Sequence, residues 1–531
     1  MPNTAEHPMD DNDAEAGPIF VPTDESSDDF HATKVVNDGD AVLVSFEDKD
    51  TADDSLFHAS WLWVNDPAHI HPTSGQRTRS PSSFYWNGGW KIDAAEVGMF
   101  QKVWENNNGS DWPLISPPPG CRHPTGSVYK VPGQGTDGSP ESMLRITWKC
   151  HDGSRSQHSY YDLNWLRYSR YDHTVIKEQL AEASVTKESA IGSDRDLYQG
   201  DFQRLVSHNT RDEACLDLLD ALVESGAALV HGAPSTLNEL DAGFTALERA
   251  EEEKDGEVVA FVGTLIAGAL SHGFLYGDTF HVRSVPDAHN IAYTSAPLPP
   301  HQDLSYYESQ PGFQLLHCIE NGTGIQGGES TLIDGMAAAN EFQSLAPELF
   351  GILCTYEATF LKQREMADIE YRRPHIEVDA ASRSTVVGFR WSPPFEGPLC
   401  IPPEHVKDFS IAYAGLERML DNSLPHDPYI SEIDPSLERQ LRDYAIEHTW
   451  EQRLEPGQIL IFNNQRLLHG RRGFRVTDTG SGTRHLAGCY TNMEETLSRY
   501  RVLRRGRLGD QGMFRGRKYQ RNTGNGSSPV R

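Results

Sequence analysis

The sequence predicts a mainly β protein in which a β-sandwich or barrel carries a few flanking helices. From Gly277 onward, short strand-like segments alternate with Gly and Pro turn signals, as in FHVRSV, AYTSA, GFQLLHCI, ESTLIDG, TVVGFRW, QILIFNN and HLAGCYT. Upstream, AVLVSF, SMLRITW and HSYYDLNWL alternate apolar and polar residues, which is typical of half-buried strands. Many short strands between turns favour a sandwich or barrel over repeated strand–helix–strand units.

The chain of 531 residues is long enough for two or three domains. We expect a disordered acidic arm over 1–30, a small β-rich domain over 31–180, a larger β-rich domain over 181–505 and a disordered basic tail over 506–531. Within the small domain, a stretch rich in Gly, Pro, Ser and Asn, from about 75 to 140, predicts long loops.

Two helices are expected in the larger domain. The segment DEACLDLLDALVESG spaces Leu216, Leu219 and Leu222 three residues apart, as on one face of a helix, and Gly226 marks its end. The strand-like AALVHG follows it. The apolar segment EVVAFVGTLIAGAL over 257–270 predicts a second, buried helix.

The charge balance excludes several kinds of partner. Lys and Arg number 47 and Asp and Glu number 77, which gives a formal charge of −30. Nucleic acids and anionic membranes need clustered positive charge, so neither is expected as the main partner. No apolar run approaches the roughly 18 residues of a membrane span, and the acidic start resembles no signal or transit peptide. We therefore expect a cytoplasmic protein.

The cysteines indicate no cross-linked framework. They are odd in number, scattered, and none forms a CxxC pair, so ordinary reduced thiols are expected. They are Cys121, Cys150, Cys215, Cys318, Cys354, Cys400 and Cys489.

The most informative residues are a His–x–Asp pair and a distant histidine. His301 and Asp303 lie in PPHQDLSYYES, and His469 lies in FNNQRLLHGRRGF. On a strand, residues two apart point to the same face, so the pair offers an imidazole and a carboxylate to one point. With the third side chain they compose a 2-His-1-carboxylate set, which leaves open positions and is typical of non-haem Fe(II).

An arginine in GTRHLAGCY strengthens this interpretation. Arg484 follows the distal histidine by fifteen residues, and a guanidinium inside a barrel can bind a carboxylate with two parallel hydrogen bonds. A buried arginine needs a counter-charge, so its partner is either a dicarboxylate ligand or an internal acid of the protein.

A His–x–Asp pair alone has little specificity, because the chain has 22 histidines and other such spacings occur, as at His69 and His71. Two functions from other classes therefore stay open. One is a zinc-dependent hydrolase that uses the same ligands, and the other is a non-catalytic binding protein that keeps the fold.

Three blocks in the same order resemble a known family. They are NIAYTSAPLPPHQDLSYYESQPGFQLLHCIENG, then GGESTLIDG, then FNNQRLLHGRRGF followed by RHLAGCY. Together they are similar to the γ-butyrobetaine and trimethyllysine hydroxylase branch of the TauD-like Fe(II)/2-oxoglutarate dioxygenases. The resemblance covers roughly 185–505 and, more loosely, the β region from 39 to 180.

The resemblance implies that 181–505 form a double-stranded β-helix, or jelly roll, with Fe(II) at its mouth. It implies that His301, Asp303 and His469 are the metal ligands, and that Arg484 and Ser330 bind the distal carboxylate of 2-oxoglutarate. In this family 2-oxoglutarate and O2 are consumed, succinate and CO2 are formed, and a C–H bond of a small molecule is oxidised.

The resemblance also suggests a substrate pocket. The family positions match Tyr276, Phe280, Asn290, Tyr293, Leu304 and Tyr490. Relatives that act on trimethylammonium compounds hold the cation in an aromatic cage. Here Phe280 stands where a Trp is usual and Leu304 where a further Tyr is usual, while GFRWSPPF (388–395) replaces a strand that contains Asn.

The family's N-terminal domain usually carries zinc on three cysteines and a histidine. The matching stretch WLWVNDPAHIHPTSGQR has no cysteine, so only His158 aligns with a ligand and we expect no zinc there. The resemblance further implies a homodimer.

These observations together predict an oxygenase that acts on a small amino-acid-like or cationic metabolite of secondary metabolism. The alternative within the family is a γ-butyrobetaine or trimethyllysine hydroxylase of carnitine biosynthesis.

Overall fold

The protein was studied as a computed structural model and divides into two compact units, Met1–Lys177 and Glu178–Arg531. Each unit is described by itself. The structure describes residues 19–22, 30–48, 51–66, 69, 80–103, 141–150, 153, 156–171, 191–235, 257–272, 275–283, 294–364, 367–380, 383–425, 434–477 and 483–508.

The first unit contains two antiparallel sheets. One has the order β2-β3-β4 and the other β1-β5-β6-β7. Their strands are β1 (Ile19–Pro22), β2 (Phe30–Val36), β3 (Ala41–Asp48), β4 (Thr51–His58), β5 (Trp90–Val103), β6 (Glu141–Cys150) and β7 (Ser156–Asp162). Short helices are α1 (Ala59–Val64), α2 (Leu163–Tyr168) and the 3-10 helix η4 (Pro81–Gly88). Trp63 lies in the centre of the core, stacked on Trp90 at 4.9 Å and edge-on to Trp148 at 5.4 Å.

Three expectations for this unit were wrong in part. Strand β1 lies within the stretch expected to be a disordered arm, and it pairs with β5. Strand β5 itself occupies 90–103 within the region expected to be loops. The segment HSYYDLNWL is a strand only as far as Asp162, after which α2 begins. Its Leu163 and Leu166 are buried three residues apart, a helical spacing that the preceding alternation obscured.

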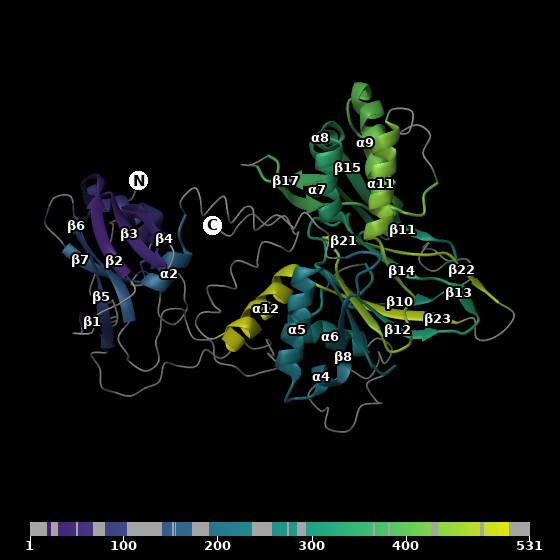
Figure 1. The fold of residues 1–531 in the computed structure, drawn as a ribbon, viewed down its shortest axis with the longest axis horizontal. Coiled ribbons are helices and arrows are strands. Elements are labelled where there is room, and N and C mark those ends of the chain that lie inside the picture. Colours follow the sequence, from purple (N-terminus) through teal and green to yellow (C-terminus); the bar gives the residue numbers. More distant parts are fainter. Residues whose placement is uncertain are drawn as a thin grey trace, which may run out of the picture. The chain divides into compact units, whose positions relative to one another are not determined.

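The second unit is built on two facing sheets (Figure 1). The larger has the order β10-β23-β12-β20-β9-β8 and is antiparallel except for β8 and β9. Its strands are β8 (Tyr198–Asp201), β9 (Ala227–His231), β10 (Thr279–Arg283), β12 (Phe313–Asn321), β20 (Ile459–Asn463) and β23 (Arg484–Thr491). The smaller has the order β11-β21-β14-β19, with β11 (Leu298–His301), β14 (Ser330–Asp334), β19 (Trp450–Gln452) and β21 (Leu467–Arg471).

Apolar side chains from both sheets meet in one cluster, among them Leu316 and Phe462 from the larger sheet and Leu332 and Leu467 from the smaller. This confirms the predicted jelly-roll architecture. Three two-stranded sheets extend it. Two are hairpins, β15 (Glu357–Arg364) with β16 (Ala367–Pro374) and β17 (Ile376–Val378) with β18 (Val386–Phe389), and the third pairs β13 (Ile325–Gly327) with the distant β22 (Phe474–Val476).

Helices cover the outer face of the larger sheet. They are α4 (Phe202–Val206), α5 (Arg211–Glu224), α6 (Glu257–Ala267) and α12 (Met493–Leu508). Their apolar side chains share a core with Phe313 and Leu315 of β12 and Cys489 of β23. Helices α5 and α6 are the two that the sequence predicted, and Gly226 after α5 has the expected left-handed backbone, with φ of 84°.

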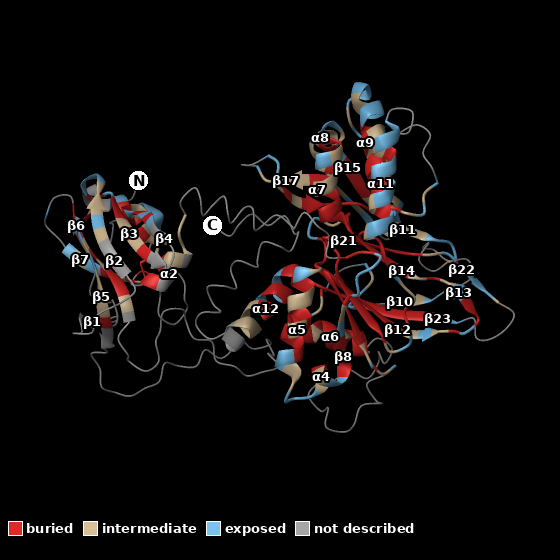
Figure 2. Ribbon diagram, in the orientation of Figure 1, coloured by how far each residue is buried: buried red, intermediate tan, exposed pale blue. Residues whose placement is uncertain are grey.

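A second group of helices lies beside the smaller sheet and was not predicted. It comprises α7 (Gly335–Leu345), α8 (Pro347–Thr355), α9 (Val406–Leu420) and α11 (Pro435–His448), with the 3-10 helices η7 (Pro393–Phe395) and η8 (Pro403–His405). Figure 2 shows α9 and α11 with one buried and one exposed face. Start signals were present in the sequence: Asp334 and Asp434 cap α7 and α11, and Pro347 and Pro435 open α8 and α11.

Other expectations have mixed outcomes. In AYTSA, residues 294–296 form bends instead of a strand, and the other two residues lie outside the described part. Of the basic tail, 506–508 belong to α12 and the rest lies outside the described residues. Among the described cysteines, Cys215, Cys318, Cys354, Cys400 and Cys489 are free thiols, whereas Cys121 is not described. None of the described helices combines the length and apolarity that crossing a bilayer requires.

Candidate active site

Two histidines face each other across neighbouring strands of the smaller sheet. His301 is the last residue of β11 and lies directly opposite His469 of β21. Opposed residues on antiparallel strands present their side chains to the same face, and the two imidazole centroids are 4.2 Å apart. The sheet register therefore brings together histidines that are far apart in the sequence.

Asp303 reaches the same point from a turn. The sequence argument placed His301 and Asp303 on one strand, but β11 ends at His301 and a turn carries the aspartate. Leu304 follows with φ of 61°, a left-handed conformation that is unusual for leucine. The carboxylate of Asp303 is therefore directed towards the imidazoles by a turn of the chain and not by the alternation of side chains along a strand.

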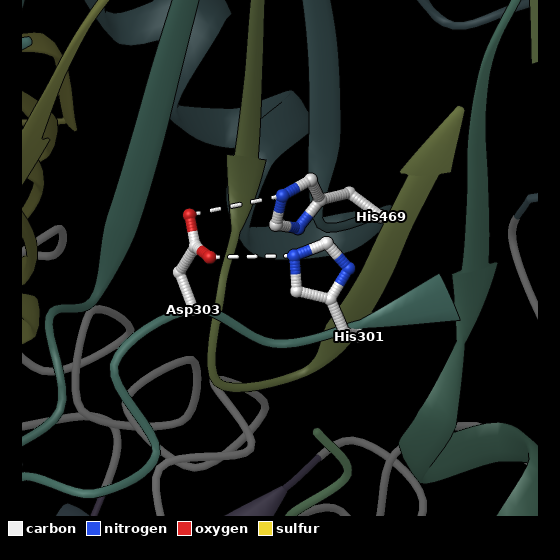
Figure 3. Close-up of side chains that lie close together, drawn as sticks. All are labelled: His301, Asp303 and His469. Carbon is white, nitrogen blue, oxygen red and sulfur yellow. Dashed lines mark ion pairs between the residues drawn. The ribbon is translucent and has the colours of Figure 1, made fainter. Parts of the chain in front are cut away.

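The three side chains leave room for one ion between them (Figure 3). Their ligand atoms all lie within 4.8 Å of one another. The Nε2 atom of His301 is 3.4 Å from Oδ1 of Asp303, and Nε2 of His469 is 3.8 Å from Oδ2. These separations are longer than ordinary hydrogen bonds. Among the described residues, no other group of three or more such side chains converges in this way.

Both imidazoles are placed to bind a metal ion. Nδ1–H of His301 donates to the carbonyl oxygen of Pro299 at 2.9 Å, which leaves a lone pair on Nε2, the atom that faces Asp303. Burial, together with the neighbouring His301, lowers the pKa of His469 to about 3. A neutral imidazole is the form that binds a metal ion.

Two donors hold the carboxylate of Asp303. The hydroxyl of Tyr490 donates to Oδ2 at 2.8 Å, and the amide of Gln314 donates to the same oxygen at 3.0 Å. Burial by itself would raise the pKa of Asp303, but the imidazoles of His469 and His301 and the Tyr490 hydroxyl outweigh it and hold this pKa well below its usual value. Because both donors use Oδ2, Oδ1 remains available to a metal.

The backbone of Asp303 is fixed as well. Asn464 accepts from its N–H at 2.9 Å and donates to its carbonyl oxygen at 3.0 Å, and Gln310 donates to that oxygen at 2.8 Å. Asn464 lies in the loop before β21, so the distal histidine block also positions the aspartate. The residues present therefore fit a divalent metal bound by two nitrogens and one oxygen.

Arg484 and Ser330 lie in the wall of the same pocket. Arg484 is the first residue of β23 and is only 6 % exposed. Burial is the main cause that lowers its pKa, and among the described residues no carboxylate pairs with it. The internal acid that was one expectation for its partner is not found in the described part. An unpaired, buried guanidinium fits a dicarboxylate such as 2-oxoglutarate.

The pocket has a volume of about 850 Å³, its open mouth included. Tyr276, Phe280 and Tyr490 line it, and the rings of Phe280 and Tyr490 stack at 5.1 Å. Leu304 is buried in the apolar cluster next to the pocket and does not line it. The two remaining candidates, Asn290 and Tyr293, lie outside the described residues.

Several wall residues were missed from the sequence. They are Tyr306, Gln314, Pro394, Phe395 and Arg471. Gln314 could have been predicted, because it is a polar residue near the start of the apolar strand GFQLLHCI. The others lie in connecting segments or in a run of several arginines. In such segments the spacing of residues does not predict which way a side chain points.

Two histidines of the N-terminal unit, among them the zinc candidate His158, contact other groups of the protein. His158 is exposed, with Nδ1 3.2 Å from the hydroxyl of Thr147. His69 is buried, and its Nδ1 lies 2.8 Å from the carbonyl oxygen of Trp63.

A jelly roll that presents two imidazoles, one carboxylate and a buried arginine to one pocket defines the class of 2-oxoglutarate-dependent non-haem iron dioxygenases. Comparison with known proteins identifies the family. The profile of the taurine catabolism dioxygenase TauD, TfdA family matches residues 191–490, and the chain belongs to this family. The sequence resemblance is confirmed.

Several relatives whose names describe dioxygenases align with large parts of the chain. It is 29 % identical to the gamma-butyrobetaine dioxygenase of Pseudomonas sp. (strain AK-1), over 69 % of this chain and 79 % of the relative. It is 26 % identical to the mitochondrial trimethyllysine dioxygenase of Bos taurus, over 68 % of this chain and 72 % of the relative. Dioxygenase str8 of Strobilurus tenacellus is 30 % identical over 43 % of this chain and 49 % of its own length.

Among solved structures, an asparagine oxygenase in complex with Fe(II), hydroxyasparagine and succinate is similar, with 16 % identity and a TM-score of 0.37, over 58 % of this chain and 97 % of that one. The non-heme iron oxygenase OrfP gives 14 % identity and a TM-score of 0.36, over 59 % of this chain and 90 % of that one.

Proposed function

We propose that this protein uses Fe(II), 2-oxoglutarate and O2 to oxidise a C–H bond of a small amino-acid-like or cationic metabolite. The observation that carries the proposal is the convergence of His301, Asp303 and His469 within 4.8 Å, in the wall of a pocket that also contains an unpaired buried arginine. A zinc hydrolase does not require a buried arginine that binds a dicarboxylate, and a non-catalytic binding protein does not require an open coordination position on a metal.

Each residue has a role in this proposal. His301 and His469 bind the metal through Nε2, and Asp303 binds it through Oδ1. Arg484 and Ser330 bind the distal carboxylate of 2-oxoglutarate. The metal and cosubstrate supply the oxidation of the C–H bond, while the protein orients the substrate and excludes water.

The substrate class rests on the relatives and on the aromatic wall. Two groups of relatives are named for trimethylammonium compounds, and Tyr276, Phe280 and Tyr490 offer ring faces that attract cations. The wall nevertheless departs from an aromatic cage, since Leu304 is withdrawn and Phe395 contributes a ring from another segment. We therefore favour a metabolite other than those of carnitine biosynthesis, with γ-butyrobetaine and trimethyllysine as the alternative.

Anaerobic titration with Fe(II) and 2-oxoglutarate tests the proposal. The wild-type protein is expected to develop the visible charge-transfer absorbance of a 2-oxoglutarate chelate on Fe(II), and to form succinate in air. His301→Ala is expected to lose both, because one of three metal ligands is removed. Arg484→Met is expected to raise the Kd of 2-oxoglutarate roughly thirtyfold or more, because the loss of one partner of a buried charge pair costs about 2–5 kcal/mol.

The matched control is His208→Ala, which removes an exposed histidine from the same unit. It should behave as wild type. Full absorbance and full turnover in His301→Ala would contradict the ligand assignment, and hydrolysis without 2-oxoglutarate would favour the zinc hydrolase. We also propose a cytoplasmic homodimer, as the family resemblance implies, which light scattering and cell fractionation can check.

A further inference from the structure

Gln302 lies between two of the proposed metal ligands and has no role in the chemistry described above. Its neighbours in the sequence are His301 and Asp303. Its side chain is completely buried, with an exposed fraction of 0 %, and it does not line the pocket. A metal bound by the two neighbours would fix the backbone on both sides of Gln302.

Three hydrogen bonds join Gln302 to two consecutive residues of a distant segment. The backbone N–H of Gln302 donates to the carbonyl oxygen of Trp391 at 2.8 Å, and the N–H of Trp391 donates to Oε1 of the Gln302 side chain at 3.1 Å. The hydroxyl of Ser392 donates to the carbonyl oxygen of Gln302 at 2.8 Å. Two of these bonds use side chains, so the junction depends on which residues occupy these positions and not only on the backbone.

The distant segment forms part of the pocket. We call residues 391–395 the wall segment, because Pro394 and Phe395 line the pocket. The ring of Trp391 is buried and stacks on Tyr413 of α9, with the two centroids 4.5 Å apart. The wall segment is therefore held by a helix through the ring of Trp391 and by the metal-binding turn through the backbone of the same residue.

The side-chain amide of Gln302 contributes one specific atom. Oε1 accepts the N–H of Trp391, whereas Nε2 has no hydrogen-bond partner among the described residues. A buried polar group without a partner destabilises the folded state. An apolar side chain would fill the same space and avoid that cost, but it would leave the N–H of Trp391 without its acceptor. The acceptor oxygen is therefore what a glutamine supplies at this position.

We propose that Gln302 is a positioning residue that couples occupation of the metal site to the arrangement of the wall segment. The inference rests on the proposed function for the metal site and adds a link from that site to the pocket wall. A coupling between two sites is reciprocal. Because the wall segment helps to hold the turn that carries His301 and Asp303, a bound metal must stabilise the wall segment by the same factor. Pro394 and Phe395 thus take their places in the pocket together with the metal.

Hydrogen exchange measured by mass spectrometry on the full chain tests the coupling, with Mn(II) alone as the probe so that no cosubstrate is consumed. In the wild type, saturating Mn(II) should slow exchange in the peptide that contains the turn and also in the peptide that contains the wall segment. The slowing in the wall segment should be roughly two- to tenfold, the range of one hydrogen bond. In Gln302→Met the turn should still be protected by Mn(II), whereas the metal-dependent protection of the wall segment should disappear and the Kd of Mn(II) should rise by a similar factor. Gln302→Glu, which keeps an acceptor oxygen, should retain the coupling.

Gln343→Met is the matched control, because it removes an amide that donates to the carbonyl oxygen of Ser384 at 3.0 Å, on α7 of the same unit. It should leave both protections unchanged. Circular dichroism verifies that each variant is folded. Ser392→Ala, which deletes the hydroxyl bond of the same junction, should reduce the protection of the wall segment and provides the test if Gln302→Met does not fold.

Three results would overturn the inference. They are a wild type in which Mn(II) protects the turn but not the wall segment, a Gln302→Met variant that keeps the protection of the wall segment, and a Gln302→Glu variant that loses it as the Met variant does. Failure of Mn(II) to protect the turn in the wild type would instead refute the metal site of the proposed function.

Discussion

The two faces of the larger sheet are formed by the same strands but have different functions. On β12, Phe313 and Leu315 point to the helices and belong to a closed apolar core, whereas Gln314 and Leu316 point to the pocket. On β23 the alternation is the same: Cys489 packs against α6, while its neighbour Tyr490 reaches Asp303. The helix-facing side is filled by the protein itself, and the other side presents polar groups to a ligand.

Successive side chains of a strand point to opposite faces of the sheet. Along one strand, residues that stabilise the fold therefore alternate with residues that contact ligands. Substitutions on the helix-facing side should change the free energy of unfolding, and substitutions on the pocket side should change binding and turnover. Neighbouring residues of one strand provide matched tests of this division.

The largest effect on stability is expected at Leu315, which is completely buried. Leu315→Ala should lower the free energy of unfolding by about 2–5 kcal/mol, because it leaves a cavity in a closed core. Leu316→Ala makes the same change one residue further on, where the side chain packs between the sheets and also lines the pocket, so it should cost less stability and in addition weaken substrate binding. Urea unfolding and KM measurements on both variants test the pair. Equal losses of stability would show that the two faces are not divided in this way.

A smaller effect is expected when the Tyr490 hydroxyl is removed and its ring is kept. Tyr490→Phe deletes the hydrogen bond to Oδ2 of Asp303, so the affinity for Fe(II) should fall roughly ten- to hundredfold. Tyr500→Phe is the control, because it removes a similar hydroxyl–carboxylate bond to Asp220 on the helix layer. Metal titration compares the two variants. Wild-type iron affinity in Tyr490→Phe would mean that Gln314 alone is enough to hold the carboxylate.

The smallest expected effect concerns the stability of the fold at acid pH. It comes from His317, a polar residue on the otherwise apolar helix-facing side of β12. His317 has the same parity as Leu315, is buried, and has no hydrogen-bond partner for either ring nitrogen among the described residues. Burial lowers its pKa to about 4, below the ordinary value of 6.5. The folded state therefore favours the neutral ring, and its stability is lost as the pH falls from about 6.5 through 4.

In His317→Leu this part of the acid destabilisation should be absent, since no group is left to bind the proton. Unfolding measured at pH 7.5 and pH 4.5 (conditions roughly on either side of the histidine range) gives the difference. Parallel pH profiles of wild type and variant would contradict the effect.

Much of the metal site was predictable from the sequence, because His301, Asp303 and His469 lie in blocks whose order and composition resemble a family. The geometric argument was less accurate: Asp303 reaches the site through a turn at Leu304 and not through strand alternation. Family resemblance supplies which residues converge. The physical route by which they converge depends on the backbone conformation, which a two-residue spacing does not determine.

The helices beside the smaller sheet were not predicted. Helix α7 begins directly after strand β14, so ESTLIDG and the following residues form one apolar stretch in which the period changes from two to 3.6.

Pro299 and Pro300 have a consequence beyond the orientation of one imidazole. Strand β11 is at the border of the smaller sheet, and its pairing with β21 is interrupted between Leu298 and His301, where the prolines lie. Proline has no amide hydrogen to offer, so an incoming chain cannot extend the ladder along this border. Pro299, whose carbonyl oxygen accepts a hydrogen bond from His301, thus also discourages, together with Pro300, aggregation through strand addition at this border.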